Sequence, residues 1–112
     1  MSDALFVYGS LRSEFDNSYA RRLRENAELV GRTTVPGSIF RIGKYPGYRR
    51  EPEGIVHGEL WRLHDPEATL AALDDYEGAE YSRIVVNGAW IYLYTGAVSA
   101  DARIQSGDFL VP

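Results

Sequence analysis

The sequence of 112 residues contains no cysteine, one methionine and two histidines. The lack of cysteine excludes disulfide bonds, a thiol nucleophile and any metal site with cysteine ligands. No apolar run approaches the roughly 20 residues that a membrane-spanning helix needs. The chain begins with no basic segment followed by an apolar one, as a secretory leader would. We therefore expect a cytoplasmic protein with no membrane partner.

The charged residues are slightly unbalanced toward acid. Twelve basic and sixteen acidic side chains give a net charge of −4, which disfavours nucleic acid as a partner because such proteins usually carry a basic surface. The arginines at positions 21, 22, 24, 49 and 50 are interpreted as solvated faces. With 45% hydrophobic residues the composition is that of a globular protein, and the length suits one core. We expect one domain over residues 1–112.

Several kinds of catalytic and binding site lack their residues. His57 and His64 have no metal-binding spacing, and no acidic calcium loop is present. Neither glycine fingerprint of the nucleotide-binding folds occurs. We therefore expect no metal and no organic cofactor. A serine hydrolase with Ser10 as nucleophile is disfavoured, because both histidines have structural explanations and the Gly-x-Ser-x-Gly elbow is absent.

Apolar periodicity and turn residues divide the chain into strands and two helices. Strands are expected at residues 5–8, 29–42 with a break at Pro36-Gly37, 55–63, 81–86 and 89–95. Helices are expected at residues 17–28, capped by Asp16, and from the Asp65-Pro66 start to Gly78. Turn residues predict a loop at 43–48, and residues 97–112 are expected to form a loop-rich tail with one short strand.

The Asn87-Gly88 pair between the last two strands predicts a β-hairpin. Strands that dominate over two short helices, with an antiparallel pair near the C-terminus, predict an α+β fold. We expect a small, curved, barrel-like sheet of mixed or antiparallel strands.

The first strand ends in an unusual way, at Tyr8-Gly9-Ser10-Leu11. A strand that stops at glycine and a small polar residue can turn its backbone N–H groups outward as a site for an anion. Junctions of this kind are common, so the segment becomes informative only together with a second one.

The second segment is Leu73-Asp74-Asp75-Tyr76-Glu77-Gly78. At 100° per residue, Glu77 lies on the same helix face as Leu70 and Leu73, which must meet the core, whereas Asp75 points away. A carboxylate on an apolar face is costly unless it is paired, hydrogen-bonded or protonated. Such burial raises the pKa and makes Glu77 a candidate general acid or base. The competing interpretation is that the helix frays and Glu77 is solvated.

These segments together resemble the gamma-glutamylcyclotransferase-like superfamily, in particular its small gamma-glutamylamine cyclotransferase-like members. Residues 6–11 look like the family's opening signature and residues 58–61 like its middle strand. Residues 73–78, followed by Tyr81 and Arg83, look like its catalytic segment, and residues 104–109 look like the ending of the smaller members. The four segments occur in the family's order.

The resemblance implies a small barrel with a cleft at one end. It also implies an acyltransferase- or lyase-type enzyme that converts a gamma-glutamyl amide into 5-oxoproline and a free amine. In that reading Glu77 is the general acid/base, and the Gly9, Ser10 and Leu11 backbone binds substrate. No metal or cofactor is required. Tyr8, Tyr45 and Tyr81 are expected at the pocket, with Tyr94 as a further candidate.

Two other classes of function remain open at this point. One is a non-catalytic small-molecule-binding protein of the same fold, against which the retained glutamate argues. The other is an interaction protein that docks through the arginines of the first helix. We expect a small gamma-glutamyl compound as partner, and a monomer or weak homodimer. The residues do not specify the leaving amine.

Overall fold

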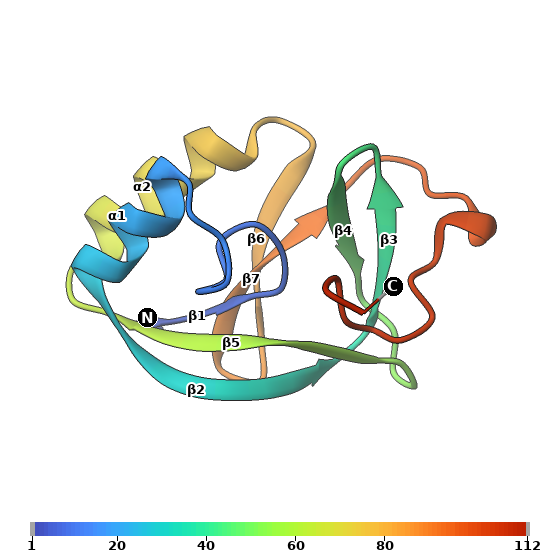
Figure 1. The fold of residues 1–112 in the computed structure, drawn as a ribbon, viewed down its shortest axis with the longest axis horizontal. Coiled ribbons are helices and arrows are strands. Elements are labelled where there is room, and N and C mark those ends of the chain that lie inside the picture. Colours follow the sequence, from blue (N-terminus) through green and yellow to red (C-terminus); the bar gives the residue numbers. More distant parts are fainter. Residues whose placement is uncertain (1, 112) are drawn as a thin grey trace.

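The computed structural model describes residues 2–111, in which seven strands form one curled sheet with two α-helices at one end (Figure 1). The elements are β1 (Ala4–Val7), α1 (Ser18–Asn26), β2 (Ala27–Pro36), β3 (Ser38–Ile42), β4 (Tyr45–Arg49), β5 (Ile55–Leu63), α2 (Pro66–Glu77), β6 (Tyr81–Val86), β7 (Ala89–Tyr94) and the 3-10 turn η1 (Ala100–Ala102). This confirms the expected α+β class and the curved mixed sheet.

Strand β7 is the centre of the sheet topology, because it pairs with three other strands. The strand order is β2-β5-β1-β7-β4-β3, and β6 pairs with β7 in the predicted hairpin. The β1 and β4 strands both run parallel to β7, with Leu5 opposite Trp90 and Tyr48 opposite Leu93. Since β6 occupies one edge of β7, β1 and β4 follow one another along the other edge. The sheet therefore forks where β1 ends and β4 begins.

The side chain of Tyr8 closes the hydrogen bonding at this fork. Its hydroxyl donates to the Tyr92 carbonyl oxygen at 2.7 Å and accepts from the Tyr48 N–H at 3.0 Å. Burial, with the nearby Glu77 carboxyl as the next cause, holds the pKa of this hydroxyl well above its usual range. The hydroxyl therefore stays neutral and links β7 to β4 where no backbone group of β1 reaches.

Strand β1 is apolar along its whole length because both of its faces are buried. Leu5 and Val7 face the helices and pack with Leu23 and Leu73, whereas Phe6 and Tyr8 belong to a second cluster on the opposite face of the sheet. That second cluster has the further members Val35, Ile39, Tyr48, Val56, Ile91 and Ile104. The sheet thus separates two apolar cores.

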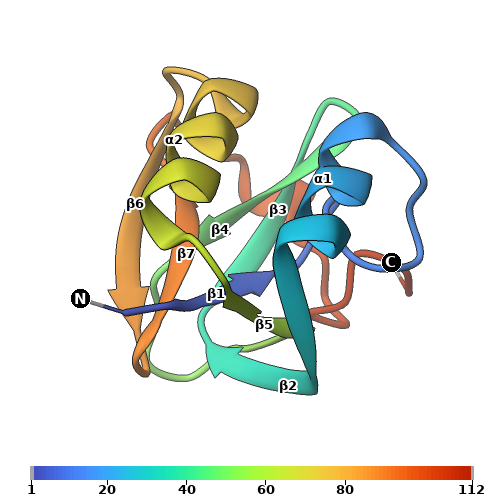
Figure 2. The same cartoon turned by 90° about the vertical axis from the view of Figure 1, so that its left-hand side faces the viewer.

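Both helices are capped, and they lie side by side over one end of the sheet (Figure 2). Asn17 accepts from the Ala20 N–H at 2.8 Å, and Asp65 accepts from the Ala68 N–H at 3.3 Å. Helix α2 ends as predicted at Gly78, whose φ of +83° is in the left-handed region that glycine tolerates. Its N–H donates to the Asp74 carbonyl at 3.1 Å.

The prediction of a loop at residues 43–48 is wrong, because only Gly43 and Lys44 form the turn and β4 begins at Tyr45. Strand β4 pairs with β3 on one side and with β7 on the other. Gly47 suits this strand because a Cβ there would come within 2.8 Å of the Tyr94 Cβ. The parallel pairing with β7 joins segments far apart in sequence, so local turn residues could not reveal it.

Helix α1 also differs from the predicted helix at residues 17–28 at both ends. Asn17, not Asp16, is the N-cap, and Asp16 instead pairs with Arg21 at 2.9 Å. The helix stops at Asn26 because Ala27 is already extended and begins the pairing of β2 with β5. Long-range strand pairing has thus overridden a continuous helical pattern.

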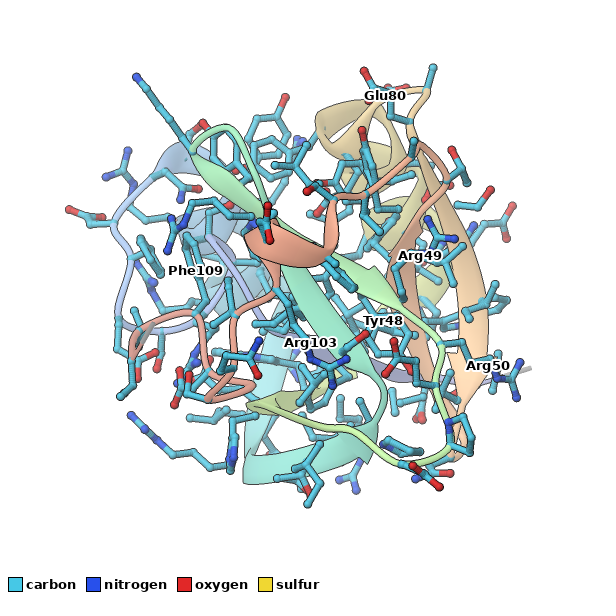
Figure 3. The ribbon with its side chains drawn as sticks, turned by 90° about the vertical axis from the view of Figure 1, so that its right-hand side faces the viewer. Tyr48, Arg49, Arg50, Glu80, Arg103 and Phe109 are labelled. Carbon is cyan, nitrogen blue, oxygen red and sulfur yellow. The ribbon has the colours of Figure 1, made fainter. Side chains whose placement is uncertain are left out.

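The C-terminal tail contains no strand over its described residues 97–111. It has the short turn η1 and one isolated bridge, between Phe40 and Arg103, and it crosses β3 as Figure 3 shows. Pro112 lies outside the described residues, as does Met1. Across residues 2–111, no helix is long and apolar enough to cross a membrane.

A Tyr8→Phe substitution tests the importance of the fork. It removes the hydroxyl and leaves both the Tyr92 carbonyl and the Tyr48 N–H without this partner in a buried place. We expect the free energy of unfolding to fall by about 1–3 kcal/mol, measured by urea denaturation. Tyr45→Phe, at a side chain that is 53% exposed, is the control and should change little. Equal effects of the two variants would contradict this role.

Candidate functional site

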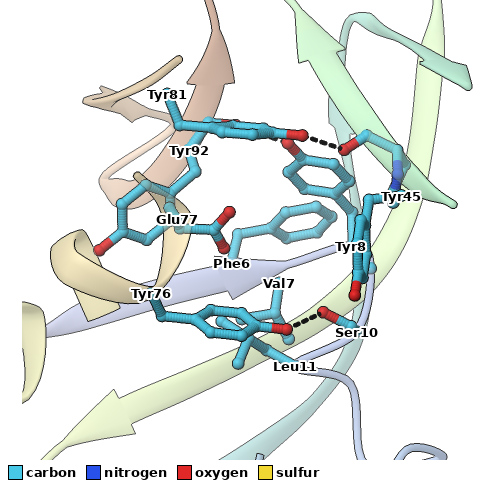
Figure 4. Close-up of a pocket in the computed structure, with 12 residues that line it drawn as sticks. Phe6, Val7, Tyr8, Ser10, Leu11, Tyr45, Tyr76, Glu77, Tyr81 and Tyr92 are labelled. Atoms are coloured by element: carbon cyan, nitrogen blue, oxygen red, sulfur yellow. Dashed lines mark hydrogen bonds between the residues drawn. The ribbon is translucent and has the colours of Figure 1, made fainter. Parts of the chain in front are cut away.

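A cavity of about 220 Å³ opens at the fork, between the segment that follows β1 and the start of β4 (Figure 4). The C-terminal end of α2 and the strands β6 and β7 complete its wall. The lining residues are Phe6, Val7, Tyr8, Gly9, Ser10, Leu11, Tyr45, Pro46, Tyr76, Glu77, Tyr81 and Tyr92. Because none of these is lysine or arginine, an anionic ligand would have to be bound by neutral donors.

Glu77 is the last residue of α2, and its carboxylate points into the cavity (Figure 4). The side chain is half-buried, while Leu70 and Leu73 on the same helix face are buried, so the placement from helical phase is confirmed. Burial alone raises the pKa of Glu77 from its ordinary 4.5 to about 7. No group within residues 2–111 forms a hydrogen bond or ion pair with this carboxylate that would oppose the shift.

The segment Gly9–Leu11 forms a tight turn on the other side of the cavity. The Arg12 N–H donates to the Gly9 carbonyl at 3.0 Å, and the Asn17 side-chain amide donates to the Ser10 carbonyl at 2.8 Å. The carbonyl groups are thus engaged from behind, whereas the N–H groups of Ser10 and Leu11 donate to no acceptor in the described part of the chain. Free neighbouring N–H groups of this kind can bind an anion.

Two hydrogen bonds between side walls frame the cavity, and both are drawn in Figure 4. The hydroxyls of Ser10 and Tyr76 lie 2.7 Å apart, and the Tyr81 hydroxyl donates to the Pro46 carbonyl at 3.0 Å. Burial raises the pKa of Tyr81 to about 12, with the Glu77 carboxyl as the next cause. Tyr81 is therefore neutral. Tyr76 connects α2 to the turn after β1, and Tyr81 connects β6 to β4.

The turn of α2 before Glu77 is attached to the hairpin by a second set of contacts. Asp74 accepts from Arg83 in a two-point contact, at 2.8 Å from Nε and 3.0 Å from Nη2, and from the Tyr92 hydroxyl at 2.7 Å. The hydrogen bond from Arg83 is the main reason that the pKa of Asp74 is lowered. The Arg83 guanidinium also lies 4.5 Å from the centre of the Trp90 ring. This clamp sets where the end of α2, and hence Glu77, lies.

The structure brings together every residue that the sequence selected for the site: Tyr8, Gly9, Ser10, Leu11, Tyr45, Tyr81 and Glu77 all line the cavity. Their chemical roles stay predictions. Tyr45 stands at the mouth and is half exposed. Tyr94 is not in the lining, since its ring packs edge-on against Tyr81 and its hydroxyl donates to Glu80 at 2.9 Å.

Tyr76 and Tyr92 are lining residues that the sequence did not select. By helical phase Tyr76 lies 100° away from Glu77, so it could only be placed once its ring was seen against Tyr19, at 4.3 Å. Tyr92 shares a strand face with Tyr94, and alternation alone could not separate them. Among residues 2–111, no cluster of three or more histidine, cysteine or acidic side chains is arranged to hold a metal ion.

Comparison with known proteins gives a consistent family. The family model described as "Gamma-glutamyl cyclotransferase, AIG2-like" matches residues 5–111. The chain is 38% identical, over 95% of both chains, to the gamma-glutamylcyclotransferase family protein YtfP of Escherichia coli strain K12. The solution structure of Escherichia coli YtfP superposes with a TM-score of 0.70 at 36% identity over 96% of each chain.

A more distant structure shows the same fold. Protein PH0828 of Pyrococcus horikoshii has a TM-score of 0.77 at 21% identity, covering 96% of this chain and 90% of its own. The fold and the matched sequence together define the class, and the chain belongs to the AIG2-like gamma-glutamylcyclotransferase family.

The raised pKa of Glu77 makes a prediction about stability. The folded protein binds the Glu77 proton more tightly than the unfolded chain, so this group lowers the free energy of unfolding as pH rises from about 4.5 to 7. Above that range the loss is complete. Glu77→Gln removes the buried charge and should stabilise the protein by about 1–3 kcal/mol at pH 8, and by much less at pH 4.

Chemical denaturation at the two pH values measures this difference. Asp75→Asn is the matched control, because Asp75 is exposed on the same turn of α2. A gain in stability that is the same at pH 4 and pH 8 would show that the Glu77 carboxyl is not strained by burial.

Proposed function

We propose that this protein is a gamma-glutamyl cyclotransferase that releases 5-oxoproline and a free amine from a gamma-glutamyl amide. One observation carries the proposal: a carboxylate whose pKa burial raises to about 7 lines one small cavity together with the turn Gly9–Leu11, where the N–H groups of Ser10 and Leu11 have no acceptor among the described residues. A proton acceptor near neutrality and an anion site are the two groups that this reaction needs.

The proposed reaction requires little covalent participation by the protein. The α-ammonium of the substrate loses a proton to Glu77, and its nitrogen attacks the γ-carbonyl carbon to form the five-membered ring. The ring nitrogen then loses its second proton, and the amide C–N bond breaks as Glu77 returns its proton to the departing nitrogen. Both protons leave with the amine, as its ammonium form. Because the nucleophile is tethered to its target, the enzyme mainly orients it.

The N–H groups of Gly9, Ser10 and Leu11 are assigned to the α-carboxylate of the substrate. With no cationic side chain in the lining, backbone donors are the groups able to hold this charge. The hydroxyls of Tyr8, Tyr76 and Tyr81 are engaged with protein groups, so these rings are assigned to shape the cavity. Tyr45, at the mouth, is assigned to the side of the leaving amine.

The remaining parts of the proposal concern assembly and location. We propose that the protein acts as a monomer or a weak homodimer. We place the reaction in the cytoplasm. The alternative is a protein of the same fold that binds gamma-glutamyl compounds without turning them over.

Glu77→Gln tests the acid/base role. The amide keeps the shape of the side chain but cannot carry a proton, so turnover should fall by roughly 10²-fold or more. For the unaltered enzyme, kcat/KM should rise with pH and level off above about 7, where Glu77 is deprotonated. Release of 5-oxoproline from a panel of gamma-glutamyl amides measures both.

Asp75→Asn, on the exposed side of the same helix, should leave both values unchanged. Near-normal turnover by the Glu77→Gln variant would assign the proton transfer to another group. Binding of gamma-glutamyl amides by the unaltered protein, with no 5-oxoproline formed from any of them, would favour the non-catalytic alternative.

The turn itself is tested by comparing Gly9→Val with Ser10→Ala. A Cβ at Gly9 would come within 2.8 Å of the Pro46 ring, so Gly9→Val should move the turn and reduce kcat/KM by about 10²-fold or more. Ser10→Ala loses its contact with Tyr76 but keeps every N–H group, and should retain substantial activity. A serine hydrolase predicts the reverse order, since Ser10 would be its nucleophile.

A further inference from the structure

Directly behind the substrate turn lies a buried arginine. Arg12, the residue that closes the Gly9–Leu11 turn, is only 1% exposed. Its guanidinium donates from Nη1 to Asp108 Oδ1 at 2.9 Å, and from Nε and Nη2 to the Glu14 carboxylate at 3.3 and 3.4 Å. A buried cation is tolerated only when such partners satisfy it. The side chain is therefore confined to this position.

The partner Asp108 comes from the other end of the chain, 96 residues away. The backbone of the tail is constrained next to Asp108. The Gly107 carbonyl accepts from the His57 N–H at 2.8 Å, and Gly107 has a φ of +71°. A Cβ at Gly107 would come within 2.0 Å of the Ile55 carbonyl oxygen. The backbone thus delivers the Asp108 carboxylate to one place.

The segment that follows the turn, residues 12–15, makes two further contacts with the rest of the fold. Phe15 stacks on Phe109 with ring centres 6.0 Å apart, and Phe109 is seen beside the loop in Figure 3. On the other side, the fully buried Glu59 of β5 accepts from the Ser13 N–H at 2.7 Å and from the Ser13 hydroxyl. The segment that follows the turn is therefore held by both the sheet and the C-terminal tail.

The positive charge of Arg12 is balanced by the carboxylates of Glu14 and Asp108, which share its guanidinium. Partial burial acts to raise the pKa of Asp108, but the hydrogen bonds from the Leu110 N–H and from Arg12 together outweigh it, so the pKa is lowered. Little of the positive charge remains to attract a substrate. Any influence of Arg12 on the cavity must pass through the backbone of the turn, to which its N–H is bonded at Gly9.

We propose that Arg12 and Asp108 are positioning residues, which hold the N–H groups of Ser10 and Leu11 in the orientation that receives the substrate carboxylate. The C-terminal tail is then part of the machinery for substrate binding, although it lies outside the cavity lining. This inference rests on the proposed function for its kinetic consequence. Its structural consequence, a turn that is ordered by Asp108, stands independently.

Asp108→Ala is the test variant, and Asp101→Ala, in the exposed turn η1 of the same tail, is its control. We expect Asp108→Ala to raise KM for an accepted gamma-glutamyl amide by about tenfold while kcat changes less than about threefold, because ground-state binding is weakened. Val86→Ala, at a buried position that does not line the cavity, is a second control: it lowers stability and should leave KM unchanged.

A second measurement needs no substrate. Hydrogen exchange by NMR reports the Arg12 N–H bond that closes the turn, and we expect its protection to fall at least about tenfold in Asp108→Ala but not in Asp101→Ala. If Asp108→Ala does not fold, Asp108→Asn removes the charge with little change in shape and should move both measurements in the same direction.

The outcomes separate this inference from the proposed function. Kinetics and exchange of Asp108→Ala that equal those of Asp101→Ala would overturn the positioning role and leave the enzyme activity intact. A lower kcat at unchanged KM would also overturn it, since the turn would then act on the reacting carbon. If the unaltered protein turns over no gamma-glutamyl amide, the proposed function fails, while exchange at Arg12 still decides whether Asp108 orders the turn.

Discussion

The rest of the structure depends on the hydroxyl of Tyr8, which joins two strands at the point where the sheet forks. Strand β7 needs a partner along its whole edge, yet β1 leaves it after a few residues and β4 takes its place. A backbone could not both pair at this point and turn away to build a cavity. The hydroxyl of Tyr8 supplies the missing donor and acceptor, so the turn at Gly9–Leu11 can leave the sheet with its N–H groups free.

The cavity then places the buried Glu77 carboxylate across from the Gly9–Leu11 turn, whose N–H groups have no acceptor within residues 2–111. Within residues 2–111, Glu77 has no hydrogen-bond or ion-pair partner, and it lies at the end of a helix held by Asp74, Arg83 and the apolar face of α2. Residues that are held against a desolvation cost of this kind are characteristic of functional sites. The charged groups that are well paired, Arg12 with Asp108 and Asp74 with Arg83, lie around the cavity and give it rigidity, and the unpaired Glu77 carboxylate lies inside it.

Local patterns in the sequence predicted much of this arrangement. The apolar first strand, the Asp65-Pro66 start and Gly78 end of α2, and the Asn87-Gly88 hairpin depend on neighbouring residues, so they could be located without a structure. The phase of a short helix likewise placed Glu77 on the buried face. Local signals gave wrong predictions where pairing between distant segments decided the secondary structure. This was so at β4, at the C-terminal end of α1, which comes earlier than predicted, and in the tail.

The sequence by itself therefore determined the class of fold and the helix face that carries Glu77, because helix phase and turn chemistry are short-range properties. The resemblance to a known family, carried by residues 6–11 and 73–78, indicated the acid/base role and the segment that faces Glu77. Only the tertiary structure decided which tyrosines line the cavity, and why the substrate turn has its shape. Tyr76 and Tyr92 reach the cavity, and Arg12 finds Asp108 across 96 positions, through packing between segments far apart in the chain. Contacts of that kind depend on how the whole sheet curls and leave no periodic trace in the sequence.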